Sequence, residues 1–217
     1  MPEWPRTKSI VMAADDAAIL KTFAAAARQR GLVTGLPAPA VCFALVRDMP
    51  YRRPSRPDLP TMVAEWCGTC SSKHRLLQAL LAAHGLSSRL MVATYHYRWT
   101  LNVPAPPPIA AILQTGPVPD VHNFLQVAST TGWQTLDATW PRAGAKLGFP
   151  VNERWMRGTP QHVACLPPFT AWPVPPDVDV AAYKNGVVDQ WCGVDRPRRE
   201  RLILALSAFI SDAGLSP

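Results

Sequence analysis

The sequence lacks any long apolar run. No stretch reaches the roughly 18 consecutive apolar residues of a membrane-spanning helix, and the longest candidate is Leu202–Ile210. The first residues, Met1–Pro5, also lack the basic and then apolar pattern of a secretory signal. Charged residues make up only 17% of the 217 residues, while 48% are hydrophobic, which is a globular composition. We therefore expect a folded cytoplasmic protein that has no membrane-bound part.

The cysteines are few and odd in number. A chain with five cysteines and enough residues for a sizeable core does not need a disulfide framework, so we expect reduced thiols. Cys67 and Cys70 form a CxxC pair, but a structural zinc site needs about two more ligands at matching spacing. The isolated Cys42, Cys165 and Cys192 do not supply them, and no thioredoxin-like βαβ pattern surrounds the pair. We expect no metal and no other cofactor.

Proline and positive charge are abundant. The 24 prolines are about twice the ordinary share of roughly 5%, and they predict many rigid loops. The net charge of +7 comes mainly from arginines spread along the chain, with the densest runs at Arg52-Arg53 and Arg196–Arg201. Because no basic stripe with interleaved aromatic residues is present, we do not expect a nucleic-acid partner. The positive net charge leaves an acidic protein partner as an open alternative.

The order of the elements predicts an α+β fold. Apolar spacing predicts helices over Asp15–Arg30, Ser71–Ala83 and Arg198–Ala213. Residues of β type predict strands over Arg89–Tyr97, Val121–Ala128 and Trp133–Thr139. The short run Ala40–Val46 is either a helix or a strand. Helices followed by antiparallel strands and a last helix indicate α+β and not a βαβ repeat.

Prolines predict loops in three places. Residues 52–60 and 103–119 are expected to be irregular for much of their length, and 141–189 has weak periodicity. The loop Pro104–Pro119 ends just before His122, so it is expected either to wall a substrate cleft or to be a rigid surface connection. The chain is expected to be a single domain, with a core at about residues 40–140 and a C-terminal extension at about 141–217 packed on it.

The segment Trp66–His74 contains the candidate nucleophile. Cys70 stands immediately before a predicted helix, where unpaired amide groups and the helix dipole favour a thiolate. Lys73, one turn later, is expected to add positive potential. Gly68 is expected to let the backbone approach a substrate, and the amide of Cys70 can donate to an oxyanion.

The predicted hairpin offers a base and a group to orient it. If Ala128 pairs with Trp133, the same register sets His122 opposite Thr139. His122 and Asp137 are then diagonal neighbours on one face of the hairpin. A slip of one residue on one strand separates them.

These three segments resemble a known family. Gly68-Thr69-Cys70 with the leucines of the following helix is similar to the nucleophile segment of the transglutaminase-like superfamily. The strands around His122 and Asp137 are similar to the family's His and Asp strands, and the resemblance covers about Asp48–Trp140. It implies a papain-like fold in which the helix that carries the nucleophile packs on an antiparallel sheet. It also implies that Cys70 is the nucleophile, His122 the general base and acid, and Asp137 the residue that orients His122.

The expected function is cysteine-dependent acyl transfer or hydrolysis. The substrate is an amide, ester or thioester, including protein- or peptide-linked ones, and an acyl-cysteine is the intermediate. The alternative is a catalytically inactive binding module of the same family, because no residue stands out as a second oxyanion donor. The residue after His122 is Asn123, where family members usually have an aromatic side chain, and Phe124 follows it.

Overall fold

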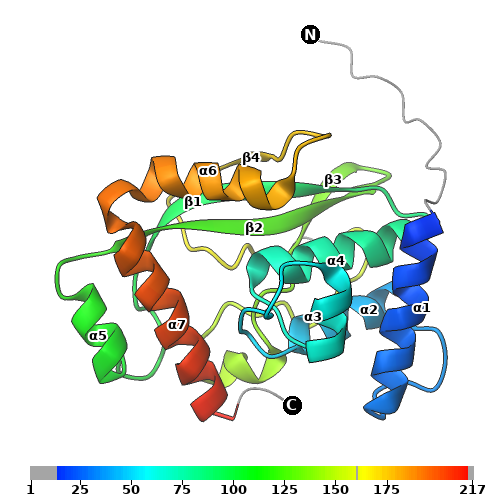
Figure 1. The fold of residues 1–217 in the computed structure, drawn as a ribbon, viewed down its shortest axis with the longest axis horizontal. Coiled ribbons are helices and arrows are strands. Elements are labelled where there is room, and N and C mark those ends of the chain that lie inside the picture. The colour runs from blue at the N-terminus through cyan, green and yellow to red at the C-terminus, as the bar shows by residue number, and fades with distance from the viewer. Residues whose placement is uncertain (1–13, 160, 215–217) are drawn as a thin grey trace, which may run out of the picture.

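A four-stranded antiparallel sheet organises the described part of the chain (Figure 1). The computed structural model describes residues 14–159 and 161–214. β1 (Ser88–Tyr97) and β2 (Val118–Ser129) form the centre of the sheet, and β3 (Gly132–Leu136) and β4 (Phe169–Pro173) form its edges, in the order β3-β2-β1-β4. The predicted α+β class is confirmed.

Four helices from the first part of the chain share one apolar core with the sheet. They are α1 (Ala14–Gln29), α2 (Pro39–Asp48), α3 (Leu59–Glu65) and α4 (Cys70–Ala83). The apolar face of α4 contributes four leucines that are fully buried among residues of α1, α2, β1 and β2, namely Leu76, Leu77, Leu80 and Leu81. Since Phe23 and Ala27 of α1 are also fully buried there, the core extends beyond the expected residues 40–140.

The C-terminal part packs on the sheet through two helices. α6 (Val180–Cys192) lies along the sheet, where Val188 and Cys192 contact Val92 of β1 and Val121 of β2 (Figure 1). A short 3₁₀ turn, η2 (Gly193–Asp195), leads into α7 (Arg196–Asp212), and another, η1 (Arg142–Leu147), follows β3. α7 packs against α5 (Pro107–Leu113).

Several proline-rich stretches contain helices that the sequence pattern did not predict. α3 and α5 begin within the expected loops 52–60 and 103–119, and both have proline in their first turn. Proline is tolerated there because the first amide groups of a helix have no partner within the helix. The same arrangement at Pro39 makes the ambiguous run Ala40–Val46 a helix, α2. The weakly periodic residues 141–189 contain β4 and most of α6.

The hairpin has the predicted register but a shorter second strand. Ala128 pairs with Trp133 as predicted, and the turn contains two residues because Ser129 pairs with Gly132. β3 ends at Leu136, since the amide of Asp137 donates to Gln161 Oε1 and not to β2. The first half of β2, which contains His122, is therefore not paired with β3.

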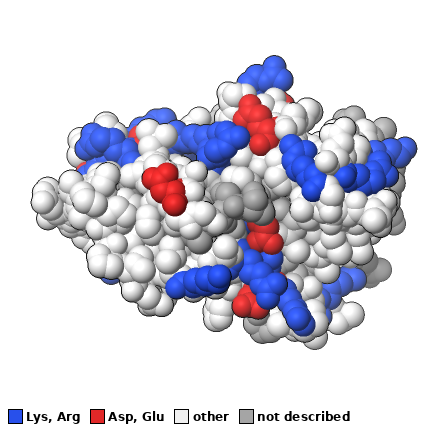
Figure 2. All heavy atoms as spheres, turned by 90° about the horizontal axis from the view of Figure 1, so that it is seen from below, with Lys and Arg blue, Asp and Glu red and all other residues white. Residues whose placement is uncertain are grey.

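The described residues have no helix that is both long and apolar enough to cross a bilayer. On the face shown in Figure 2, lysine and arginine side chains lie in separate groups with uncharged surface between them. This distribution agrees with the spread of arginines along the sequence.

Candidate active site

Cys70 is the first residue of α4, one residue before the predicted helix start. Thr69 is the N-cap, and its amide donates to Ser72 Oγ at 2.9 Å, which closes the first turn. Gly68 is buried in the preceding turn. A Cβ at this position would lie 2.7 Å from Met62 Cε and 2.8 Å from Ser72 Oγ. Glycine is therefore needed for packing at this turn. Its expected role in backbone approach to a substrate stays a prediction.

His122 and Asp137 are in direct contact. His122 Nε2 lies 2.8 Å from Asp137 Oδ2, and both side chains are almost completely buried. The Asp137 carboxylate also accepts from the amide of Ala164 and from the amide and hydroxyl of Thr139. These donors and the charge of His122 outweigh burial and hold the pKa of Asp137 far below its usual range. Asp137 is thus a fixed carboxylate that orients the imidazole.

Cys70 and His122 form a polarised pair. Burial raises the pKa of the Cys70 thiol, but the ammonium of Lys184 and the neighbouring His122 reverse this and lower it to about 6. Burial lowers the pKa of His122, but the Asp137 carboxylate and the contact with Cys70 raise it to about 10. Because Nε2 is bound to Asp137, Nδ1 is the nitrogen left to face the thiol. At neutral pH the pair is a thiolate and an imidazolium.

The structure thus brings together Cys70, His122 and Asp137, the three residues selected from the sequence. It adds Lys184, which sequence reasoning missed. Lys184 Nζ lies 3.5 Å from Cys70 Sγ and donates to Ser71 Oγ at 2.5 Å. Lys184 belongs to α6, within the weakly periodic stretch 141–189, and no spacing in the sequence connects it with Cys70.

Lys73, one turn after Cys70, interacts with the thiol only through its charge, because its ammonium binds elsewhere. Its side chain is fully buried, and Nζ donates to the carbonyl oxygens of Arg47 at 2.8 Å and Thr139 at 3.0 Å. Burial lowers the pKa of Lys73 to about 7. Lys73 therefore ties α4 to α2 and to the segment after β3, and Lys184 is the cation that contacts the thiol.

His74 is a structural link between the nucleophile and the segment after Asp137. The amide of Ala138 donates to His74 Nε2 at 2.9 Å, so Nδ1 carries the proton and donates to the Cys70 carbonyl at 2.7 Å. Burial lowers the pKa of His74 to about 4, which keeps the ring neutral. His74 thus fixes the first turn of α4 beside Asp137.

Asn123, the residue after His122, supports the first turn of α4. Its Oδ1 accepts from Ser71 Oγ at 3.0 Å, and its Nδ2 donates to the Met91 carbonyl at 2.9 Å. The next residue, Phe124, stacks on the His122 ring with 6.2 Å between centroids. The imidazole therefore has an aromatic neighbour two residues along β2.

Cys70 opens onto a cleft of about 570 Å³. The cleft is lined by the first turn of α4, by α6 and α7, and by side chains from residues 51–57. None of its lining residues lies in the loop Pro104–Pro119, so of the two alternatives for this loop the cleft wall is wrong. Ile109 and Val118 of that segment pack instead against Leu202 and Leu206 of α7. Residues of α6 and α7, in the C-terminal extension, form a wall of the cleft instead.

The residues that the structure describes include no group of three or more side chains placed to hold a metal ion. Cys67 is fully buried, 3.8 Å from Glu65 Oε2, and burial raises the pKa of its thiol. The five cysteines are all buried and unbridged.

Comparisons with protein-family models, with curated proteins and with solved structures gave no match to this chain.

Proposed function

We propose that this protein catalyses acyl transfer or hydrolysis through an acyl-cysteine formed on Cys70. The observation that carries the proposal is the His122–Asp137 contact of 2.8 Å in the same site as a thiol at a helix N-terminus. A thiolate nucleophile, a base and an oriented carboxylate are the parts that such catalysis requires. The sequence resemblance to transglutaminase-like enzymes, and a papain-like arrangement of helix and sheet, belong to the same proposal.

The reaction begins with attack of the Cys70 thiolate on the carbonyl carbon of an amide, ester or thioester. The C–S bond forms, and the electron pair of the C=O bond moves to oxygen. The amide of Cys70, at the start of α4, can donate to this oxyanion. When the intermediate collapses, the bond to the leaving group breaks and the His122 imidazolium protonates the leaving group.

The second half of the reaction restores the enzyme. Neutral His122 removes a proton from water or from an amine as that acceptor attacks the thioester carbonyl. Collapse of the second intermediate breaks the C–S bond, which releases the acid or the new amide and leaves the Cys70 thiolate beside the His122 imidazolium. Asp137 stays ionised throughout and holds the ring.

Alkylation with limiting iodoacetamide from about pH 5 to 9, read for all five cysteines by peptide mass spectrometry, tests the pair. We expect Cys70 to react with a midpoint near 6, well below the roughly 8.5 of an unperturbed thiol. In His122→Ala this midpoint rises. Cys67, three residues away and also buried, is the internal control and stays unreactive. A Cys70 that titrates as an ordinary thiol in both proteins contradicts the proposal.

Turnover distinguishes the enzyme from an inactive binding module. Incubation with acyl esters and a competing amine gives an amide product if the acyl group is transferred and an acid if it is hydrolysed. Cys70→Ala abolishes both reactions. A Cys70→Ala protein that keeps its full biological activity would instead support the binding module.

A further inference from the structure

We propose that Lys184 is a catalytic residue that pairs first with the Cys70 thiolate and then with the oxyanion of the tetrahedral intermediate. This inference rests on the proposed function and supplies the second oxyanion donor that the sequence does not reveal. It is carried by the 3.5 Å contact between Lys184 Nζ and Cys70 Sγ and by the 2.5 Å contact to Ser71 Oγ.

The position of Lys184 is fixed from two sides. α6 is held on the sheet by Val188 and Cys192, and its start is capped by Asp179, whose Oδ1 accepts from the amide of Ala182 at 2.7 Å. On the other side, Ser71 Oγ accepts from Lys184 and donates to Asn123 Oδ1. The ammonium is therefore placed before the reaction starts, which is the condition for effective electrostatic stabilisation.

Negative charge moves from the Cys70 sulfur to the substrate's carbonyl oxygen during acylation. When Cys70 forms the C–S bond, its negative charge is lost to the carbonyl oxygen, which is bonded to the carbon next to sulfur. Lys184 then has no anion on sulfur, and the new oxyanion forms only two bonds away from that sulfur. The thiolate and the oxyanion thus use the same cation in succession, together with the Cys70 amide.

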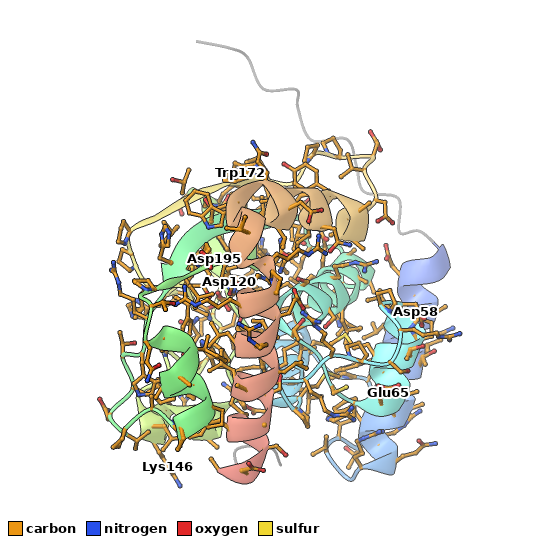
Figure 3. The ribbon with its side chains drawn as sticks, turned by 60° about the vertical axis from the view of Figure 1, so that its left-hand side comes forward. Asp58, Glu65, Asp120, Lys146, Trp172 and Asp195 are labelled. Atoms are coloured by element: carbon orange, nitrogen blue, oxygen red, sulfur yellow. The ribbon has the colours of Figure 1, made fainter. Side chains whose placement is uncertain are left out.

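The test compares Lys184→Met, which removes the charge, with Lys184→Arg, which keeps it. Lys146→Met is the matched control, because Lys146 is exposed on η1, at the opposite end of the molecule from α6 (Figure 3). In Lys184→Met we expect the Cys70 alkylation midpoint to rise by about one pH unit or more. Lys184→Arg and Lys146→Met keep a depressed midpoint. An unchanged midpoint in Lys184→Met overturns the thiolate contact.

The oxyanion role is measured at a pH one unit above the midpoint of the variant, where its thiolate is formed. We expect the single-turnover acylation of Lys184→Met by p-nitrophenyl acetate to stay slower than wild type by about 100-fold there. Full recovery of the rate at that pH overturns the oxyanion role. If wild-type Cys70 forms no acyl-enzyme, the proposed function fails, whereas the alkylation midpoints still decide the Lys184–Cys70 contact.

The cleft beside Cys70 has more cationic than anionic side chains in its lining. Its lining includes five cationic side chains (Arg53, Arg75, Lys184, Arg196 and Arg199) and two carboxylates (Asp120 and Glu200). Both carboxylates are already paired, because Arg199 binds Asp120 and Glu200, and Arg53 also binds Glu200. Arg196 pairs with Asp189. Arg75 has no carboxylate partner among the described residues and donates only to the Pro57 carbonyl at 3.1 Å.

From this arrangement we infer that the acyl donor carries a carboxylate in addition to its reacting carbonyl group, and that Arg75 binds this carboxylate. Arg75 lies four residues after Ser71 on α4, so the two side chains are neighbours on one helix face, about 5–6 Å apart at Cβ. Ser71 in turn contacts Lys184 beside the thiol. A carboxylate a few bonds from the reacting carbonyl therefore reaches Arg75 while that carbonyl lies at Cys70.

Glutarate and its neutral diamide, glutaramide, test this subsite without any need for turnover. We expect glutarate to slow the alkylation of Cys70 by iodoacetamide about tenfold more than glutaramide does at the same concentration. This difference disappears in Arg75→Gln and persists in Arg201→Gln, which removes an exposed arginine outside the cleft. Equal protection by the two compounds, or a glutarate preference that survives in Arg75→Gln, overturns the inference.

Discussion

Arg199 of α7 and Asp120 of β2 form an ion pair inside the protein, with 2.6 Å between Nε and Oδ1. Tyr95 of β1 donates its hydroxyl to the other oxygen of Asp120 at 2.7 Å. The pair joins the C-terminal extension to β2 at a position two residues before His122. The extension is therefore part of the framework that holds the strand with His122.

Removing one partner of this pair should destabilise the whole fold. Arg199→Leu leaves the Asp120 carboxylate buried without its cation, so we expect the free energy of unfolding to fall by about 3–5 kcal/mol. Urea denaturation followed by circular dichroism measures the loss. The double variant Asp120→Asn/Arg199→Leu should recover part of it, because no charge is left unpaired. A loss below about 1 kcal/mol for Arg199→Leu would mean that the pair behaves like one at the surface.

The part of the site that depends on local structure could be predicted from the sequence. Cys70 is placed by a helix start, and His122 and Asp137 are brought together by the register of one hairpin, in which Ala128 pairs with Trp133. Each of these features depends on residues close in the chain. The predicted proximity of His122 and Asp137 is therefore confirmed even though β3 is shorter than expected.

The remaining residues could not be predicted because they depend on long-range packing. Lys184 reaches Cys70 across 114 positions of sequence, and Arg199 reaches Asp120 across 79. Nothing in the prolines and weak periodicity of residues 141–189 indicates that α6 would lie over the start of α4. The partners of Lys73 are long-range too, since its position relative to Cys70 does not reveal the carbonyl oxygens of Arg47 and Thr139 around it.

The turn before Cys70 should not tolerate a side chain at position 68. In Gly68→Ala the new Cβ meets Met62 Cε at 2.7 Å, Ser72 Oγ at 2.8 Å and Lys73 Cγ at 3.1 Å. Moving Ser72 breaks its contact with the Thr69 amide, so we expect a loss of about 1–3 kcal/mol in unfolding free energy and a higher Cys70 alkylation midpoint. Gly186→Ala is the control, because a Cβ there meets nothing within 4 Å in α6. It should leave stability unchanged or raise it by up to about 1 kcal/mol. Equal stability of the two variants would argue against tight packing at Gly68.

The titrations of Cys70 and His122 should give a bell-shaped dependence of kcat/KM on pH. The pKa of Cys70 is lowered to about 6, so the thiolate and the rate increase as the pH rises through 6. The pKa of His122 is raised to about 10, so the imidazolium that protonates the leaving group is lost as the pH rises through 10. We expect kcat/KM for an acyl anilide to show both limbs.

A p-nitrophenyl ester of the same acyl group is the control for that profile. Its leaving group departs without a proton, so the rising limb near pH 6 stays and the falling limb near pH 10 disappears. If the two substrates lose activity together near pH 10, the falling limb reports a change in the protein and not the proton donated by His122.

His74 should make the protein sensitive to acid. Its pKa is lowered to about 4 by burial, whereas an unfolded histidine titrates near 6.5. Between these values the unfolded chain binds more protons than the native protein, so stability falls as the pH drops from about 6.5 to about 4. Protonation of Nε2 also removes the acceptor for the Ala138 amide, which loosens the segment that holds Asp137.

The variant His74→Gln isolates this effect, because glutamine does not titrate and its amide oxygen can accept from Ala138. We expect the wild type to lose about 2–3 kcal/mol of unfolding free energy between pH 6.5 and 4 relative to His74→Gln, measured by urea denaturation at each pH. His96→Gln, which changes an exposed histidine next to Trp191, should follow the wild type. Parallel pH curves for wild type and His74→Gln would mean that another group causes the acid sensitivity. A difference confined to this window would instead show that the residue one turn from Cys70 stabilises the site by staying neutral.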